Sequence, residues 1–206
     1  MGSSQAIGKG LNVWGLTGGI GSGKSKAGEF LSQLGCPIVD ADALAKDIRQ
    51  NHLVAQKQLH TLFGTTEETE IRKKAFTEPH LKKALEAVLH PLIQEASEKI
   101  FLDIDQKRSD ASLPIIYEAS QLIETGRHSE LRGLIVVTAP KDVRIERLVK
   151  QRGLSKEEIQ RIMNHQLPEE TRIAKADYII ENPGNLALLK ANTESVFRKI
   201  VDQPNC

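Results

Sequence analysis

The fold of this chain is decided by the stretch Gly18-Gly19-Ile20-Gly21-Ser22-Gly23-Lys24-Ser25. It matches G-x-x-x-x-G-K-[ST], the pattern of a phosphate-binding loop. Glycines let such a backbone turn tightly, so that successive N–H groups point at phosphate oxygens. In this pattern Lys24 is expected to bridge the β- and γ-phosphates, and the Ser25 hydroxyl to ligate Mg²⁺. The sequence therefore predicts a nucleotide site.

The segments on both sides of the loop favour the same interpretation. Residues 11–17, Leu-Asn-Val-Trp-Gly-Leu-Thr, are typical of a buried strand, and residues 24–34 predict a helix with Ala27 and Leu31 on its apolar face. The start of that helix adds its positive dipole end to an anion site. A glycine-rich turn without function would not require this strand–loop–helix context.

Four further apolar segments predict the rest of a parallel sheet. Since they alternate with helical patterns, we expect an α/β protein with the three-layer fold of P-loop NTPases and a five-stranded parallel sheet. The segments are residues 37–39, 113–117, 134–138 and 178–180. Residues 43–108 are helical and charged, with a turn near 63–66. This stretch is far longer than the dozen or so residues of a parallel crossover, which predicts a helical substrate-binding insertion.

Composition narrows the class of protein. The 206 residues are 39% hydrophobic and 27% charged with a net charge of +1, which favours a globular protein that binds neither nucleic acid nor membranes. Apolar runs fall short of the ~20 residues of a membrane span, and residues 1–6 lack the apolar core of a signal peptide. With only Cys36 and Cys206 as cysteines, we expect a cytoplasmic protein. The oligomeric state stays open.

An acidic pair follows the second predicted strand, in Asp40-Ala41-Asp42. Ligands of open parallel sheets bind beyond the carboxyl ends of strands, so these carboxylates are expected at the same edge as the phosphate loop. There, a carboxylate can accept the proton of a substrate hydroxyl during phosphoryl transfer. Asp42 as the N-cap of a helix that starts at Ala43 is the structural alternative.

Arginines follow the fourth predicted strand. Their planar guanidinium groups can stabilise the charge that develops on a transferred phosphoryl group. The charge argument favours Arg147 and Arg152 for contact with nucleotide over Arg144 and Arg161. Each of them could instead be a solvated surface residue.

From residue 13 to about residue 184, the chain resembles the dephospho-CoA kinases. The resemblance rests on the order and spacing of several motifs. These are residues 16–25, Leu-Thr-Gly-Gly-Ile-Gly-Ser-Gly-Lys-Ser; residues 39–42, Val-Asp-Ala-Asp; residues 89–93, Leu-His-Pro-Leu-Ile; residues 147–155, Arg-Leu-Val-Lys-Gln-Arg-Gly-Leu-Ser; Gln166; and residues 176–182, Ala-Asp-Tyr-Ile-Ile-Glu-Asn.

The resemblance implies transfer of the ATP γ-phosphoryl group to the ribose 3′-hydroxyl of dephospho-CoA, with Mg²⁺ as the metal. It implies a base at Asp42, a phosphate clamp at Lys24 and a metal ligand at Ser25. It makes Arg147 catalytic and places His90 on the CoA side, where a helix break at Pro91 explains that motif equally well. The nucleotide-binding set is Gly19, Gly21, Ser22, Gly23, Lys24, Ser25, Lys26, Arg152 and Asn182, the last beside the adenine.

The resemblance also implies an organisation of one P-loop kinase domain over residues 1–206. Its core comprises residues 11–42, 111–152 and 173–206, the CoA-side insertion is about 43–110, and a helical lid spans about 153–172.

Two departures from the family pattern bear on function. Lys26 stands where many relatives carry Thr, and residues 120–124, Ser-Gln-Leu-Ile-Glu, replace the usual Pro-Leu-Leu-x-Glu. Glu118, just before, could hold metal-bound water. Two other functions compete: a small-molecule kinase of the shikimate or gluconate type, and a nucleotide-binding module without turnover, which the altered loop suggests. ADP release with and without dephospho-CoA would separate all three.

Overall fold

The structure is a computed structural model that describes residues 10–203, so expectations about residues 1–9 and Cys206 lie outside the described part. The described chain divides into two compact units: unit 2 is Asp40–Ile100, and unit 1 comprises the residues before and after it. Among the described helices, none combines the length and the apolar character that crossing a membrane requires.

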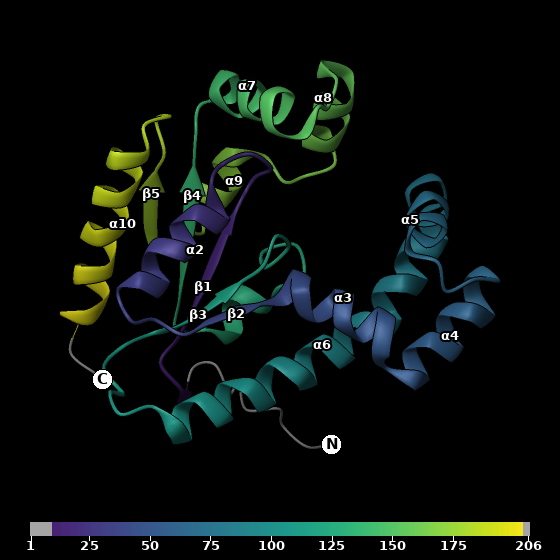
Figure 1. Cartoon of the computed structure of the whole chain (residues 1–206), viewed down its shortest axis with the longest axis horizontal. Helices are drawn as coiled ribbons and strands as arrows, with labels where there is room; N and C mark the ends of the chain where they lie inside the picture. Colours follow the sequence, from purple (N-terminus) through teal and green to yellow (C-terminus); the bar gives the residue numbers. More distant parts are fainter. Residues whose placement is uncertain (1–9, 204–206) are drawn as a thin grey trace. The chain divides into compact units, whose positions relative to one another are not determined.

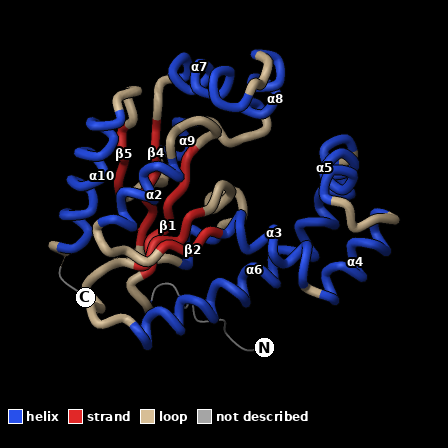
Figure 2. The backbone as a smooth tube through the Cα atoms, in the orientation of Figure 1, coloured by secondary structure: helices blue, strands red, loops and turns tan. Residues whose placement is uncertain are grey.

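Unit 1 is built on a five-stranded sheet in the order β2-β3-β1-β4-β5, drawn in red in Figure 2. The strands are β1 (Val13–Gly18), β2 (Ile38–Asp40), β3 (Ile115–Glu118), β4 (Gly133–Thr138) and β5 (Tyr178–Glu181). β1 pairs in parallel with β3 and β4, and β4 pairs in parallel with β5. This confirms the predicted parallel sheet and places β1, which leads into the phosphate loop, at its centre.

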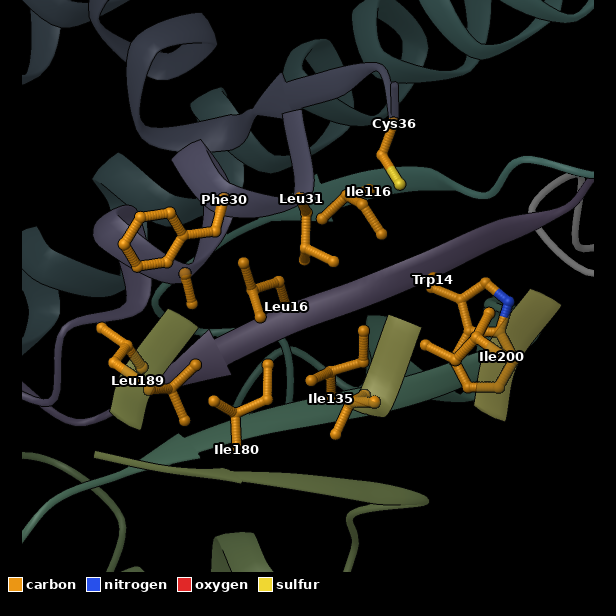
Figure 3. Packing of buried hydrophobic residues seen from close by; sticks show 13 residues of the cluster. Trp14, Leu16, Phe30, Leu31, Cys36, Ile116, Ile135, Ile180, Leu189 and Ile200 are labelled. Atoms are coloured by element: carbon orange, nitrogen blue, oxygen red, sulfur yellow. The ribbon is translucent and has the colours of Figure 1, made fainter. Parts of the chain in front are cut away.

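Two helices cover one face of the sheet. α2 (Lys24–Gln33) packs against β1 and β3, and α10 (Leu186–Val201) packs against α2 and β5 (Figure 1). Side chains alternate along a strand, so every second residue of β1 faces these helices. The resulting core, shown in Figure 3, contains Trp14, Leu16, Ala27, Phe30, Leu31, Cys36, Ile116, Ile135, Val137, Ile180, Leu189, Val196 and Ile200.

The segment after β4 carries three more helices of unit 1. α7 (Lys141–Arg152) leads to α8 (Lys156–Asn164) and α9 (Glu169–Ile173). α7 and α8 contact each other, and α9 contacts β4. A 3₁₀ turn, η1 (Arg127–Glu130), precedes β4. The Tyr117 ring of β3 packs edge-on against the Phe101 ring, with 5.2 Å between ring centres.

Unit 2 is helical. It contains α3 (Ala41–Asn51), α4 (Leu53–Phe63), α5 (Glu68–Thr77) and most of α6 (Pro79–Lys107). The predicted turn falls between α4 and α5, where Gly64 ends α4 with a φ of 69°.

The alternative of a helix break at Pro91 is wrong, because α6 continues through this proline. Proline removes one helical hydrogen bond, and packing on both sides offsets that loss. Leu89 before Pro91 and Leu92 after it belong to one apolar cluster with Ile48 and Ala55.

Candidate active site

The phosphate loop joins the central strand β1 to α2. Gly23 is the N-cap of α2 and has a φ of 95°, in the left-handed region that glycine tolerates and other residues rarely adopt. A Cβ at Gly23 would also collide with the side-chain amide of Asn182. The sequence therefore needs glycine here for both backbone conformation and space. The N-terminal N–H groups of α2 then lie at the loop, as an anion site requires.

Lys24 and Ser25 meet the end of β3. The Ser25 hydroxyl donates a hydrogen bond to Glu118 Oε1 at 2.8 Å. Lys24 Nζ lies 3.5 Å from the same oxygen and donates to Ser120 Oγ at 3.2 Å. Glu118 is 6% exposed, so its carboxylate is buried with a cation and a hydroxyl as partners. Lys24 and Ser25 of the loop motif thus share one carboxylate as a partner.

The chemistry of these groups fits a magnesium ion. A hydroxyl and a carboxylate are hard oxygen donors, and Mg²⁺ in phosphate-transfer sites takes one or two protein ligands, with waters and phosphate oxygens completing the shell. Within residues 10–203, no group of three or more His, Cys, Asp and Glu side chains is arranged to hold a metal. The candidate protein ligands are Ser25 and Glu118, whose oxygens lie 2.8 Å apart.

Arg147 and Asn182 bind the side of the loop that faces α7 and the end of β5, which we call its outer side. Arg147 Nη1 donates to the Gly21 carbonyl at 3.1 Å, and Asn182 Nδ2 donates to the Ser22 carbonyl at 2.7 Å. Arg147 Nη2 donates to Asn182 Oδ1 at 2.8 Å, which joins the two side chains. Sequence reasoning expected both residues at the nucleotide. The structure brings both of them to the loop, where each donates to one of its carbonyls.

These contacts orient the loop's donors. In a trans peptide, a carbonyl and the following N–H point in opposite directions. Because the Ile20 and Ser22 carbonyls are held on the outer side by Arg144 and Asn182, the N–H groups of Gly21 and Gly23 face the other side. The Ser22 N–H closes a turn to the Gly19 carbonyl at 3.0 Å.

Arg144 is more deeply engaged than the sequence indicated. The sequence favours Arg147 over Arg144 for contact with nucleotide and leaves a solvated surface position open for Arg144. In the structure the Arg144 residue is only 6% exposed. Its Nε donates to the Ile20 carbonyl at 2.8 Å and its Nη1 pairs with Glu169 Oε2 at 2.7 Å. Burial lowers the pKa of Arg144 from its ordinary value, and Glu169 opposes that shift. Its three-residue spacing from Arg147, which puts both on one side of a helix, was the available signal.

Lys26, Arg152 and Arg161 lie nearer the surface, whereas Gln166 reaches the loop. Lys26 pairs with Glu29 one turn along α2. Arg152 is exposed at the last turn of α7, and Arg161 is exposed on α8. Gln166, in the loop between α8 and α9, accepts a hydrogen bond from the Ile20 N–H at 2.9 Å.

In unit 2, the capping prediction needs correction. α3 starts at Ala41, and Asp40 is its N-cap, accepting from the N–H groups of Asp42 at 2.8 Å and Ala43 at 3.1 Å. The helix starts two residues earlier than expected, because the Asp40 side chain reaches the N2 and N3 donors. Asp42 lies in the first turn with an exposed side chain, so capping is not its role. His90 is exposed on α6.

The chain is similar to known proteins over most of its length. The family model for dephospho-CoA kinase matches residues 12–187. A dephospho-CoA kinase from Corynebacterium jeikeium is 36% identical over 182 residues, covering 85% of this chain and 92% of that protein. A crystal structure from Thermus thermophilus has a TM-score of 0.76 at 31% identity, covering 91% of this chain and 96% of that one. A dephospho-CoA kinase structure from Campylobacter jejuni has a TM-score of 0.67 at 25% identity, covering 93% and 98%.

Proposed function

The chain belongs to the dephospho-CoA kinase family, and we propose that it transfers the γ-phosphoryl group of ATP to the ribose 3′-hydroxyl of dephospho-CoA, giving ADP and CoA. The observation that carries the proposal is the arrangement of Lys24 and Ser25, at the start of α2, around Glu118 at the end of β3. A glycine loop, a clamp cation and a metal-binding pair are the parts that a P-loop kinase requires.

The triphosphate is proposed to bind along the loop. The N–H groups of Gly21, Gly23 and the first turn of α2 donate to its oxygens, and the Lys24 ammonium lies between the β- and γ-phosphates. The proposed Mg²⁺, held by Ser25 and Glu118, would neutralise charge on the phosphate oxygens when bound. We extend the nucleotide site to Gly19, Ser22, Lys26, Arg152 and Asn182.

Asp42 is the proposed base. During transfer, the 3′-hydroxyl oxygen attacks the γ-phosphorus, the bond to the β–γ bridging oxygen breaks, and the hydroxyl proton passes to Asp42. Two features support the assignment: Asp42 is not the N-cap of α3, and it lies in the first turn of the helix that begins where β2 ends. Arg147 is proposed to stabilise charge in the transition state, since its guanidinium is already at the loop.

The predicted organisation is retained as a proposal. Unit 2 falls largely within the proposed CoA-side insertion of residues 43–110, where the exposed His90 would contact dephospho-CoA. Residues 153–172, with α8 and the start of α9, form the proposed lid. We propose a cytoplasmic location, consistent with the low cysteine content.

The decisive test is ADP formation with different acceptors. We expect turnover with dephospho-CoA and with an analogue blocked at its thiol, and weak turnover with adenosine, which lacks the remote binding groups. Shikimate and gluconate should be inactive. Lys24→Ala should fold normally and lose about 10²-fold or more of turnover. Faster turnover with shikimate or gluconate would refute the assigned acceptor, and ATP binding without turnover on any acceptor would favour the binding module.

A further inference from the structure

Two adjacent peptides of the phosphate loop, Gly19–Ile20 and Ile20–Gly21, are both held by the segment that follows β4. The Ile20 N–H donates to Gln166 Oε1 at 2.9 Å, and the Ile20 carbonyl accepts from Arg144 Nε at 2.8 Å. Arg144 Nη1 also pairs with Glu169 Oε2 at 2.7 Å. Side chains from α7 and from the α8–α9 loop therefore meet at Ile20, and Glu169 of α9 acts on it through Arg144.

The position of Ile20 makes this restraint important. It lies between Gly19 and Gly21, and Gly21 has a φ of 76°. Glycines give a backbone more freedom than other residues do, so the peptides around Ile20 are the ones that local sterics restrain least. External hydrogen bonds must then fix their direction. Since the Ile20 carbonyl is held outward, the Gly21 N–H is held toward the opposite side of the loop.

The packing around Arg144 shows that the contact is built into the fold. The guanidinium lies so close to the loop that a Cβ at Gly19 would be 2.5 Å from Arg144 Nη2. With Arg144 only 6% exposed, its donors need fixed acceptors, because a buried charge without partners is costly. Ile20 and Glu169 supply them. Moving α9 would therefore remove one of the groups that hold Arg144 against the loop.

We propose that Gln166 and Arg144 are positioning residues for ATP, which set the direction of the loop's phosphate-binding N–H groups by holding the two peptides on either side of the Ile20 Cα. The affinity for the triphosphate then depends on residues 153–172 being docked on the loop. By linkage, bound triphosphate stabilises that docking to the same extent. The inference rests on the proposed ATP site and is independent of the acceptor that receives the phosphoryl group.

The first experiment compares two glutamines of the same segment. Gln166→Met keeps the side-chain length and removes the acceptor. Gln160→Met is the matched control, since Gln160 is exposed and donates to Asn164 of its own helix. Calorimetry with a non-hydrolysable imido analogue of ATP should show an affinity about three- to tenfold lower for Gln166→Met, the range expected for one lost hydrogen bond. Adenosine affinity should be unchanged, and the control should match the parent protein for both ligands.

A direct readout comes from the Ile20 amide. In Gln166→Met its proton should exchange faster with solvent and its NMR resonance should shift, while Gln160→Met should leave both unchanged. If the amide is released but the ATP analogue binds as in the parent protein, the positioning role is refuted. If Gln166→Met does not fold, as judged by thermal melting, Gln166→Asn replaces it. Asn is one methylene too short to reach the same N–H, and the same two outcomes decide.

Arginine variants provide an independent check. Arg144→Lys keeps the charge, but a single ammonium cannot reproduce the fork that spans the Ile20 carbonyl and Glu169. It should weaken the ATP analogue by a similar factor, whereas Arg161→Lys, at an exposed position of α8, should not. Equal effects of the two variants would overturn the proposal. The two proposals can fail separately. If the parent protein does not phosphorylate dephospho-CoA but Gln166→Met and Arg144→Lys still weaken binding of the ATP analogue, the proposed function is refuted and this inference is supported.

Discussion

Glu118 accepts a hydrogen bond from the Ser25 hydroxyl at 2.8 Å, which ties the end of β3 to the start of α2. The other carboxylate oxygen, Glu118 Oε2, lies close to the backbone of α2, because a Cβ at Gly28 would be only 2.6 Å from it. Burying the Glu118 carboxylate has a desolvation cost, which its contacts with Lys24 and Ser25 oppose. The pair is therefore the natural place to test metal binding.

Glu118→Gln should raise the Mg²⁺ concentration needed for half-maximal activity. The amide keeps an acceptor for Ser25 but removes the charge that attracts the cation, and losses of metal affinity of about 10- to 100-fold accompany such changes around metal ligands. The measurement is ADP formation against free Mg²⁺ at fixed ATP. Glu29→Gln, on the exposed side of α2, is the control. An unchanged Mg²⁺ dependence would remove Glu118 from the metal site.

Arg147→Lys should lower kcat/KM for ATP by about tenfold or more. The guanidinium bridges the Gly21 carbonyl and Asn182 Oδ1, and one ammonium cannot serve both directions. Steady-state kinetics would measure the effect, with Arg198→Lys as a control because that side chain is 73% exposed on α10. Activity equal to that of the control would mean that the bridge to the loop is dispensable.

Substitutions at Asp42 and Asp40 should distinguish the role of a general base from that of a helix N-cap. Asp42→Asn should lower kcat by about 10²–10⁴-fold, the usual contribution of a general base, with little change in the free energy of unfolding. Asp40→Ala removes the N-cap of α3 and should lower the free energy of unfolding by about 0.5–2 kcal/mol. Kinetics and denaturant melts on both variants test the pair. A normal kcat in Asp42→Asn would exclude it as the base.

Ser120→Ala should reduce kcat/KM for ATP by about three- to tenfold. The Ser120 hydroxyl accepts a hydrogen bond from the Lys24 ammonium at 3.2 Å, and such bonds to charged groups are stronger than neutral ones. Ser129→Ala is the control, in η1 of the same β3–β4 connection, where the Ser129 hydroxyl donates to the Gly126 carbonyl. Recovery in Ser120→Thr, which keeps a hydroxyl, would show that the bond to Lys24 is responsible. If Ser120→Ala leaves kcat/KM for ATP unchanged, the altered 120–124 loop has no functional role at Lys24.

The local pattern of residues was enough to predict most of unit 1. The motif at residues 18–25 has a conformation that its glycines permit and that its neighbours, an apolar strand and an amphipathic helix, enforce. The strands lie where their apolar runs predicted, because a parallel strand covered on both faces leaves a nearly continuous hydrophobic signature. The start of α3 was misplaced, since both Asp40 and Asp42 have the chemistry of an N-cap and only the backbone selects between them.

What the sequence determined by itself was the phosphate loop, its lysine and serine, and the parallel sheet that carries them, because these depend on short-range spacing. The tertiary structure decided which distant side chains hold that loop: Gln166, Arg144 and Asn182 are separated from their loop partners by 146, 124 and 160 residues. Such contacts depend on how α7, the α8–α9 loop and the end of β5 pack around β1. A single arginine or glutamine has the same local signature whether solvent or a buried carbonyl is its partner, so only the packed fold could distinguish them.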